Sequence, residues 1–262
     1  MNMIDLRNRT AKLRAHRYLI RQMAVFERYI FSRVRRFFRN QYRQIADEIG
    51  NGDIRIESII NNNRPLFGML MIFYQRVGTQ FSELFIDSFN KVRQKDLLSS
   101  FWQHYQNWTR TYCAQRVMDV TATTKKRIKR IIDKGVVDKL TNAEISKSIY
   151  KLSEIESIYR ARRIAITETH TMSTTTMSEM AHSENAIQEK EWSAVNDERT
   201  RDWHVTYGDS FADSGLPIRI GIDEQYEVNG ELLDYPGDPK GSGANIINDR
   251  CVELYFTRSR EE

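Results

Sequence analysis

The chain has 262 residues, with 40 Lys and Arg against 35 Asp and Glu. That length can hold one large domain or two small ones, and the two distant cysteines, Cys113 and Cys251, exclude a disulfide scaffold and indicate a reducing compartment. No apolar run approaches the roughly 18 residues of a membrane span, and no apolar leader follows Met1, so we expect neither a membrane span nor a secretion signal.

The net charge of +5 hides a strong asymmetry along the chain. Residues 1–43 hold 12 Lys and Arg against 2 Asp and Glu, whereas residues 187–262 hold 8 against 17. A basic beginning and an acidic end favour more than one module.

Apolar periodicity predicts a series of helices in the first half of the chain. Apolar residues recur every three or four positions over residues 13–45, with Arg on the other faces, which predicts one long amphipathic helix that ends at Asn51-Gly52-Asp53. A short helix around Ile59 follows. Pro65 suits the first turn of a third helix, and a fourth runs from about residue 98 to 132, with Gly135 as its end.

Two capping boxes predict two further helices. Thr141 to Glu144 opens a helix that reaches about Leu152, and Ser153 to Glu156 opens another that continues to about Ala186. The polar stretch over residues 167–176 is rich in Thr and Ser, which are mediocre helix formers, so we expect tertiary packing against the following sheet to hold it.

The period of the pattern changes after this helix, which predicts short strands. Alternation is visible at residues 191–195 and 251–256, and residues 226–228 precede Asn229-Gly230, a strong hairpin signal. The predicted fold class is therefore α+β, with a basic amphipathic helical arm over residues 1–50, a helical bundle over 51–152 and a small α+β domain over 153–262.

The first helix is a candidate nucleic-acid interface. Arg outnumbers Lys eleven to one over residues 1–43 and alternates with aromatic residues, and guanidinium groups match phosphate or carboxylate partners. Docking on acidic protein surfaces explains the pattern equally well. The second basic run, residues 125–130, is more simply a solvated helix face. The candidate nucleic-acid-binding residues are Arg14, Arg17, Arg21, Arg28, Arg33, Arg35, Arg36, Arg39, Lys125, Lys126, Arg127, Lys129 and Arg130.

Two polar clusters near the end of the chain suggest the two ends of one small fold. The order runs from Glu168 and Trp192 through the turn at residues 197–204 and a Pro-Gly loop to residues 246–251. Over residues 154–256 this order resembles the phage head morphogenesis family, the Mu F-like minor head proteins. Ile166 and Asp249 depart from the family pattern, which usually has Arg and Cys there. The residues that carry the resemblance are Glu168, Trp192, Asp197, Arg199, Arg201, His204, Asn248, Arg250 and Cys251.

The turn from Asp197 to His204 admits an enzymatic and a structural interpretation. His204 could act as a general base while arginines hold an anion. Alternatively, Asp197 caps the turn, the arginines pair with Glu168 or loop carboxylates, and His204 hydrogen-bonds inside the domain. Because no paired carboxylates at hydrolase spacing, nucleophile elbow or phosphate-binding Gly loop accompanies the turn, we expect a structural role, no catalytic residue and no enzyme.

His204, Cys251 and Asp249 are candidate metal ligands. A structural zinc prefers four ligands dominated by Cys and His, and Asp249 stands where a second soft ligand would be. We therefore expect no stoichiometric metal and no cofactor.

The resemblance implies a minor head protein of a tailed phage or prophage that acts by binding in head assembly near the portal. It implies the portal protein and the major capsid or scaffolding protein as partners, with double-stranded DNA as a further one. The expected location is inside the virion head, after a stage in the host cytoplasm. The alternative is a nuclease or nucleotide-dependent transferase that uses Asp197, Arg201 and His204; a free regulator lacks any recognisable recognition module.

Overall fold

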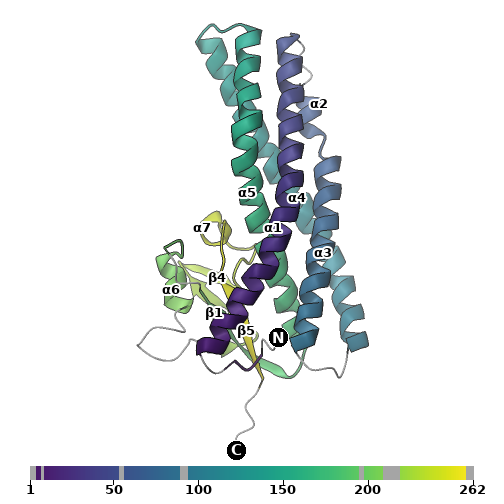
Figure 1. The fold of residues 1–262 in the computed structure, drawn as a ribbon, viewed down its shortest axis with the longest axis vertical. Helices are drawn as coiled ribbons and strands as arrows, with labels where there is room; N and C mark the ends of the chain where they lie inside the picture. Colours follow the sequence, from purple (N-terminus) through teal and green to yellow (C-terminus); the bar gives the residue numbers. More distant parts are fainter. Residues whose placement is uncertain are drawn as a thin grey trace, which may run out of the picture. The chain divides into compact units, whose positions relative to one another are not determined.

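The computed structural model describes residues 4–6, 9–52, 56–88, 94–194, 198–208 and 219–257. Long helices come first and a small sheet follows (Figure 1), so the predicted α+β class is confirmed. The chain forms two compact units: a sheet unit of Met1–Glu27, Gln75–Gln106 and Ile166–Glu262, and a helical unit of Arg28–Tyr74 and Asn107–Ala165. The arm, bundle and domain expected along the sequence stay a prediction.

The first four helices follow the apolar periodicity closely. They are α1 (Arg9–Gly50), α2 (Ile56–Asn61), α3 (Arg64–Ser88) and α4 (Gln94–Val137). The predicted end of α4 at Gly135 is wrong by two residues. A Cβ on Gly135 would lie 2.5 Å from the Ile145 side chain, so this glycine permits a close approach rather than ending the helix.

A single helix, α5 (Asn142–His182), replaces the two helices predicted around residue 153. The first capping box is confirmed, because the Glu144 carboxylate accepts the Thr141 N–H at 2.8 Å. The second box is wrong. Ser153 is fully buried within the helix, and the Ser157 hydroxyl donates to its carbonyl at 2.6 Å. No Gly or Pro precedes Ser153 to end the helix, so it continues.

The strands form two small antiparallel sheets. One has the order β2-β1-β5 and the other is the β3-β4 hairpin. Asn229 (φ 51°) and Gly230 (φ 76°) make its turn, so the hairpin predicted from these two residues is confirmed. The bounds are β1 Ile187–Ser193, α6 Asp202–Gly208, β2 Arg219–Gly221, β3 Tyr226–Val228, β4 Glu231–Leu233, α7 Gly243–Ile246 and β5 Val252–Thr257.

Trp192 is the centre of the sheet-unit core. Its fully buried ring meets the Tyr226 ring edge-on at 5.2 Å and packs with Leu233 and Cys251. The same strand, β1, holds the start of α1. Lys12 forms a buried ion pair with Glu191 at 2.8 Å, and His16 Nδ1 lies 3.0 Å from the Ser193 hydroxyl.

A buried arginine connects three helices in the helical unit. Arg160 of α5 donates to the Tyr42 hydroxyl of α1 at 2.6 Å and to the Val120 carbonyl of α4 at 3.1 Å. Its guanidinium also lies over the Phe38 ring, 4.2 Å from the centroid. Over the described residues, no helix combines the length and the apolar character needed to cross a membrane.

Candidate functional sites: the motif cluster and the basic helices

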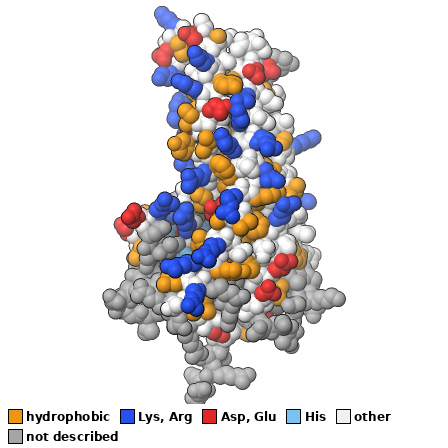
Figure 2. All heavy atoms as spheres, viewed as in Figure 1, with side chains coloured by type: hydrophobic (Ala, Val, Ile, Leu, Met, Phe, Trp, Pro, Cys, Tyr) orange, Lys and Arg blue, Asp and Glu red, His pale blue; other side chains and the backbone are white. Residues whose placement is uncertain are grey.

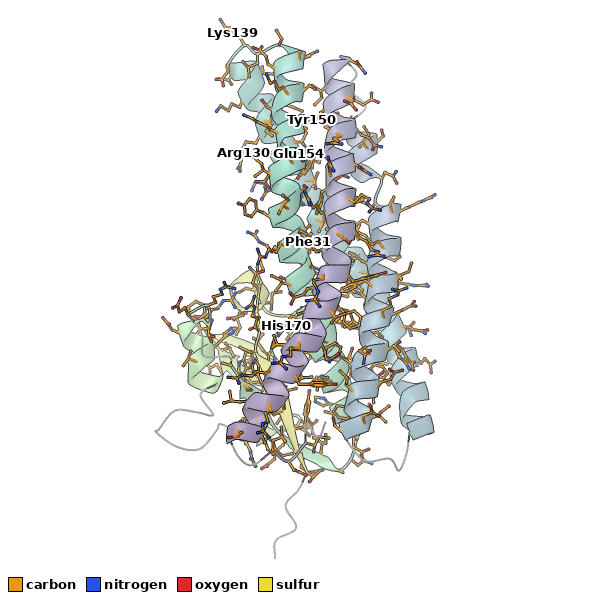
Figure 3. All side chains as sticks on the ribbon, in the orientation of Figure 1. Phe31, Arg130, Lys139, Tyr150, Glu154 and His170 are labelled. Carbon is orange, nitrogen blue, oxygen red and sulfur yellow. The ribbon has the colours of Figure 1, made fainter. Side chains whose placement is uncertain are left out.

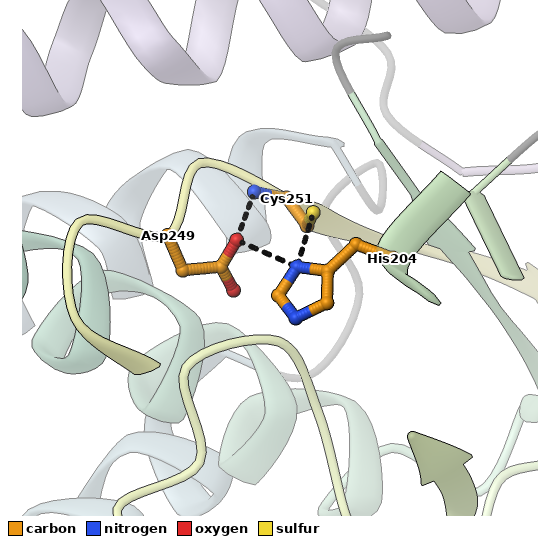
Figure 4. A group of neighbouring side chains, drawn as sticks. All are labelled: His204, Asp249 and Cys251. Atoms are coloured by element: carbon orange, nitrogen blue, oxygen red, sulfur yellow. Dashed lines mark hydrogen bonds and ion pairs between the residues drawn. The ribbon is translucent and has the colours of Figure 1, made fainter. Parts of the chain in front are cut away.

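His204, Asp249 and Cys251 meet in the interior of the sheet unit (Figure 4). His204 comes from α6, and the other two come from the turn before β5. His204 Nδ1 lies 3.4 Å from Cys251 Sγ and 3.4 Å from Asp249 Oδ1, and none of the three residues is more than 2% exposed. The two sequence clusters therefore do converge, and we name this group the motif cluster.

Backbone and aromatic contacts fix the motif cluster in place. Asp249 Oδ1 accepts the N–H groups of Arg250 at 2.7 Å and Cys251 at 3.0 Å. The Trp192 ring packs edge-on against the His204 ring, with 5.3 Å between centroids. The positions of these three side chains are thus set by the fold around them.

The electrostatics of the motif cluster do not suit nucleophilic catalysis. Burial, and then the Asp249 charge, raises the pKa of the Cys251 thiol well above its usual value, so the thiol stays protonated and unreactive. Burial alone would raise the pKa of Asp249, but His170 and His204 outweigh it and lower that pKa to about 2. Moreover, the thiol and the carboxylate both face Nδ1 of His204, whereas a catalytic relay needs them on different imidazole nitrogens.

Arg201 bonds carbonyl oxygens in place of the carboxylate that we expected. Its guanidinium donates to the carbonyls of Asn245 at 3.3 Å and Ile247 at 2.5 Å. The short helix α7 ends here and leaves such carbonyls without helical partners, which explains the choice. Asn245, which the sequence analysis missed, also accepts the Trp203 indole N–H at 2.8 Å.

The threonine-rich part of α5 binds the loops of the sheet unit through one helix face. Asn248 N–H donates to Thr167 at 3.2 Å, Thr171 donates to the Gly237 carbonyl at 3.1 Å, and Thr175 donates to the Tyr235 hydroxyl at 3.0 Å. We expected packing against the sheet and missed these bonds. The spacing of four residues between the threonines is the signal that marks this face.

His170, for which we predicted no role, is also part of α5 (labelled in Figure 3) and, like Thr171, contacts the segments before β5. Its Nε2 lies 2.6 Å from the Cys251 carbonyl and 4.0 Å from Asp249 Oδ2. Gly237 approaches the ring so closely that a Cβ there would lie 2.4 Å from Nδ1. No local pattern in the sequence marks this contact.

The other residues of the predicted motif divide between interior and surface. Glu168 is buried on α5, Arg250 is half-buried, and Arg199 and Asn248 are exposed. Asn248 has a left-handed backbone, with φ 58°. Asp197 lies outside the described residues.

The predicted basic residues are largely exposed. In the sheet unit, Arg14, Arg17 and Arg21 lie at spacings of three and four on one face of α1. In the helical unit, Lys and Arg side chains outnumber Asp and Glu over the helices that face the viewer in Figure 2. The exposed candidates there are Arg28, Arg33, Arg36, Lys125, Lys126, Lys129 and Arg130, and the half-buried ones are Arg35, Arg39 and Arg127.

Acidic side chains of the helical unit already neutralise three of these candidates. Glu154, labelled in Figure 3, lies 3.3 Å from Arg39, and Glu57 lies 2.6 Å from Lys125. Arg127 pairs with Glu156. The second basic run is therefore partly a solvated, paired helix face.

Residues 125–224 match the family model described as Phage Mu protein F like protein. This match confirms the resemblance to the Mu F-like head morphogenesis family over that part of the chain, and it suggests a phage head morphogenesis protein. No curated protein and no solved structure matches the chain.

Proposed function

We propose that this protein is a minor head protein of a tailed phage or prophage, and that it works by binding DNA and head proteins through different units. The family match supports the head-morphogenesis part of the proposal. The opposite net charges of the two units support this division of roles. The helical unit holds 22 Lys and Arg against 10 Asp and Glu, a net of +12, whereas the sheet unit holds 18 against 25, a net of −7.

The helical unit suits double-stranded DNA. Exposed Arg28, Arg33 and Arg36 offer guanidinium groups to phosphates, and binding of this kind releases counterions without reading sequence. The Arg33 guanidinium also lies 3.7 Å from the centre of the Tyr29 ring, which orients it at the surface. The acidic sheet unit would repel DNA as a whole and is the better candidate for docking on the portal, capsid or scaffolding protein.

The enzymatic alternative has weaker support. Among the described residues of the turn, His204 is 1% exposed, and the half-buried Arg201 already donates to backbone carbonyls, so the pair offers little to a substrate. His204→Gln separates the two functions. An enzyme would lose nuclease or transferase turnover with its melting temperature unchanged, whereas a structural site loses stability.

DNA binding is tested on the full chain, because apolar residues of α1 are buried and a truncation would expose them. The triple variant Arg28→Gln, Arg33→Gln, Arg36→Gln should weaken binding to any duplex. The slope of log K against log salt should fall by up to about 3, since each lost phosphate contact removes about 0.9.

A matched control removes the same charge from the second basic run, by Lys126→Gln, Lys129→Gln and Arg130→Gln. We expect this variant to keep most of the salt slope, because the paired face around Lys125 and Arg127 is the weaker candidate. Equal salt slopes for the wild type and the first triple variant would refute the DNA part of the proposal.

The proposed location is the inside of the head near the portal, reached by assembly in the host cytoplasm. Mass spectrometry of purified, nuclease-treated particles should then detect the protein at low copy in full heads. Deletion should impair assembly or infectivity and leave major capsid synthesis intact. Absence from particles, with abundance in the infected-cell lysate, would favour the enzyme or a free regulator instead.

A further inference from the structure

We propose that the motif cluster is a zinc site in which His204, Asp249 and Cys251 are the ligands. One imidazole nitrogen, one carboxylate oxygen and one sulfur lie within 4.8 Å of one another (Figure 4). This mixed set suits zinc, whereas Mg²⁺ and Ca²⁺ prefer oxygen ligands alone. The proposal is independent of any DNA or capsid contact.

The two distances from His204 Nδ1 match those of a tetrahedral zinc. Zn–N of about 2.05 Å, Zn–O of about 2.1 Å and Zn–S of about 2.3 Å place N and S about 3.6 Å apart and N and O about 3.4 Å apart. The corresponding distances from His204 Nδ1 are 3.4 Å to Cys251 Sγ and 3.4 Å to Asp249 Oδ1. Three protein ligands leave one coordination position for a further group.

An unpartnered carboxylate oxygen is the second, independent observation. Asp249 is 2% exposed, and its Oδ2 is buried without a hydrogen-bond partner among the residues that the structure describes. Nε2 of His170 lies 4.0 Å from this oxygen, too far for a hydrogen bond, so a bound metal would complete the compensation of the buried carboxylate.

The surrounding contacts prepare the ligands for a metal. The N–H groups of Arg250 and Cys251 hold Asp249 Oδ1, and the Trp192 ring fixes the plane of His204. Binding would release the Cys251 thiol proton and join α6 to the turn before β5, so the metal would stabilise the sheet unit. Our sequence-based prediction of no stoichiometric metal treated Asp249 as a lost ligand; the geometry gives it a ligand's position, and this proposal replaces that prediction.

The test uses untagged full-length protein, purified without chelator and then loaded with zinc or cobalt alone. Elemental analysis should find about one zinc per chain, and cobalt should give a thiolate-to-metal absorption band. Both should be lost in Cys251→Ser and His204→Gln. The matched control is Cys113→Ser, since Cys113 is the other buried cysteine and lies in the helical unit; it should keep both signals.

Each contrary outcome overturns the proposal. If the folded wild-type protein takes up no zinc, the proposal is wrong, whatever the variants show. Zinc that stays bound to Cys251→Ser, or that is lost equally from Cys113→Ser, would show that the metal binds elsewhere.

Discussion

Gly237→Ala should destabilise the sheet unit through a side chain far away in the sequence. Gly237 has φ 77°, and a Cβ there would lie 2.4 Å from Nδ1 of His170. His170 is buried and cannot yield without breaking its contact with the Cys251 carbonyl at 2.6 Å. The substitution therefore adds a displaced ring to the backbone strain of an alanine with positive φ.

Gly230→Ala is a matched control for the backbone strain. Gly230 has φ 76°, and a Cβ there would meet nothing within 4 Å. The left-handed backbone alone costs an alanine about 1–2 kcal/mol. A buried carbonyl that loses its partner costs about 1–3 kcal/mol more. We expect the free energy of unfolding of Gly237→Ala to fall below that of Gly230→Ala by about 1–3 kcal/mol.

Urea unfolding of the full chain, followed by circular dichroism and tryptophan fluorescence, measures both variants. His170→Ala makes room for the new methyl group, so the double variant Gly237→Ala, His170→Ala should lose less stability than the two single losses added together. Equal losses for Gly237→Ala and Gly230→Ala would refute the reasoning, because the ring of His170 would then move without penalty.

Substitutions at three further positions, His16, Arg201 and Arg160, test polar groups inside the two units. Burial lowers the pKa of His16 to about 4, so as the pH falls the unfolded chain binds a proton before the folded chain does. The free energy of unfolding should therefore fall by about 3 kcal/mol between pH 6.5 and 4. Subtracting the pH profile of His16→Gln isolates this loss. Arg201→Ala should lower the free energy of unfolding by about 1–3 kcal/mol, because two carbonyls lose a charged donor, and an unchanged urea midpoint would contradict this. Arg160→Ala should lower the free energy of unfolding by about 1–3 kcal/mol, because the Tyr42 hydroxyl and the Val120 carbonyl lose a charged donor. Arg160→Met should cost less, since Met keeps the bulk over Phe38, and equal urea midpoints for the two variants would argue against that packing.

Much of the secondary structure follows from local sequence. The apolar period fixed the extent of α1 to within a few residues, and Asn229-Gly230 specified its hairpin because both residues accept positive φ. The helix boundary predicted at Ser153 is wrong because the residues of a capping box are also tolerated inside a continuing helix. Within α5 the Ser157 hydroxyl donates to the Ser153 carbonyl of the helix backbone.

The sequence predicts the motif residues of the candidate site but not their partners, because those partners lie far away along the chain. The order of the motif along the chain correctly predicts that His204 and Cys251 belong to the same small fold. The partners from α5 and α7, above all His170 and Asn245, contact residues that lie about 40 to 80 positions away in the sequence. No local periodicity predicts contacts at that separation. The two units are likewise assembled from segments that alternate along the chain.

The motif explains the fold of the sheet unit better than it explains the partner of the protein. Trp192, His204 and Cys251 lie in the interior, so their order reports how this unit closes. A partner meets the surface instead, where Arg199 and Asn248 are the exposed members among the motif residues that the structure describes. Under the proposed function, recognition of a head protein would therefore rest mainly on surface residues outside the motif. Substitutions of interior motif residues should then act on it through stability.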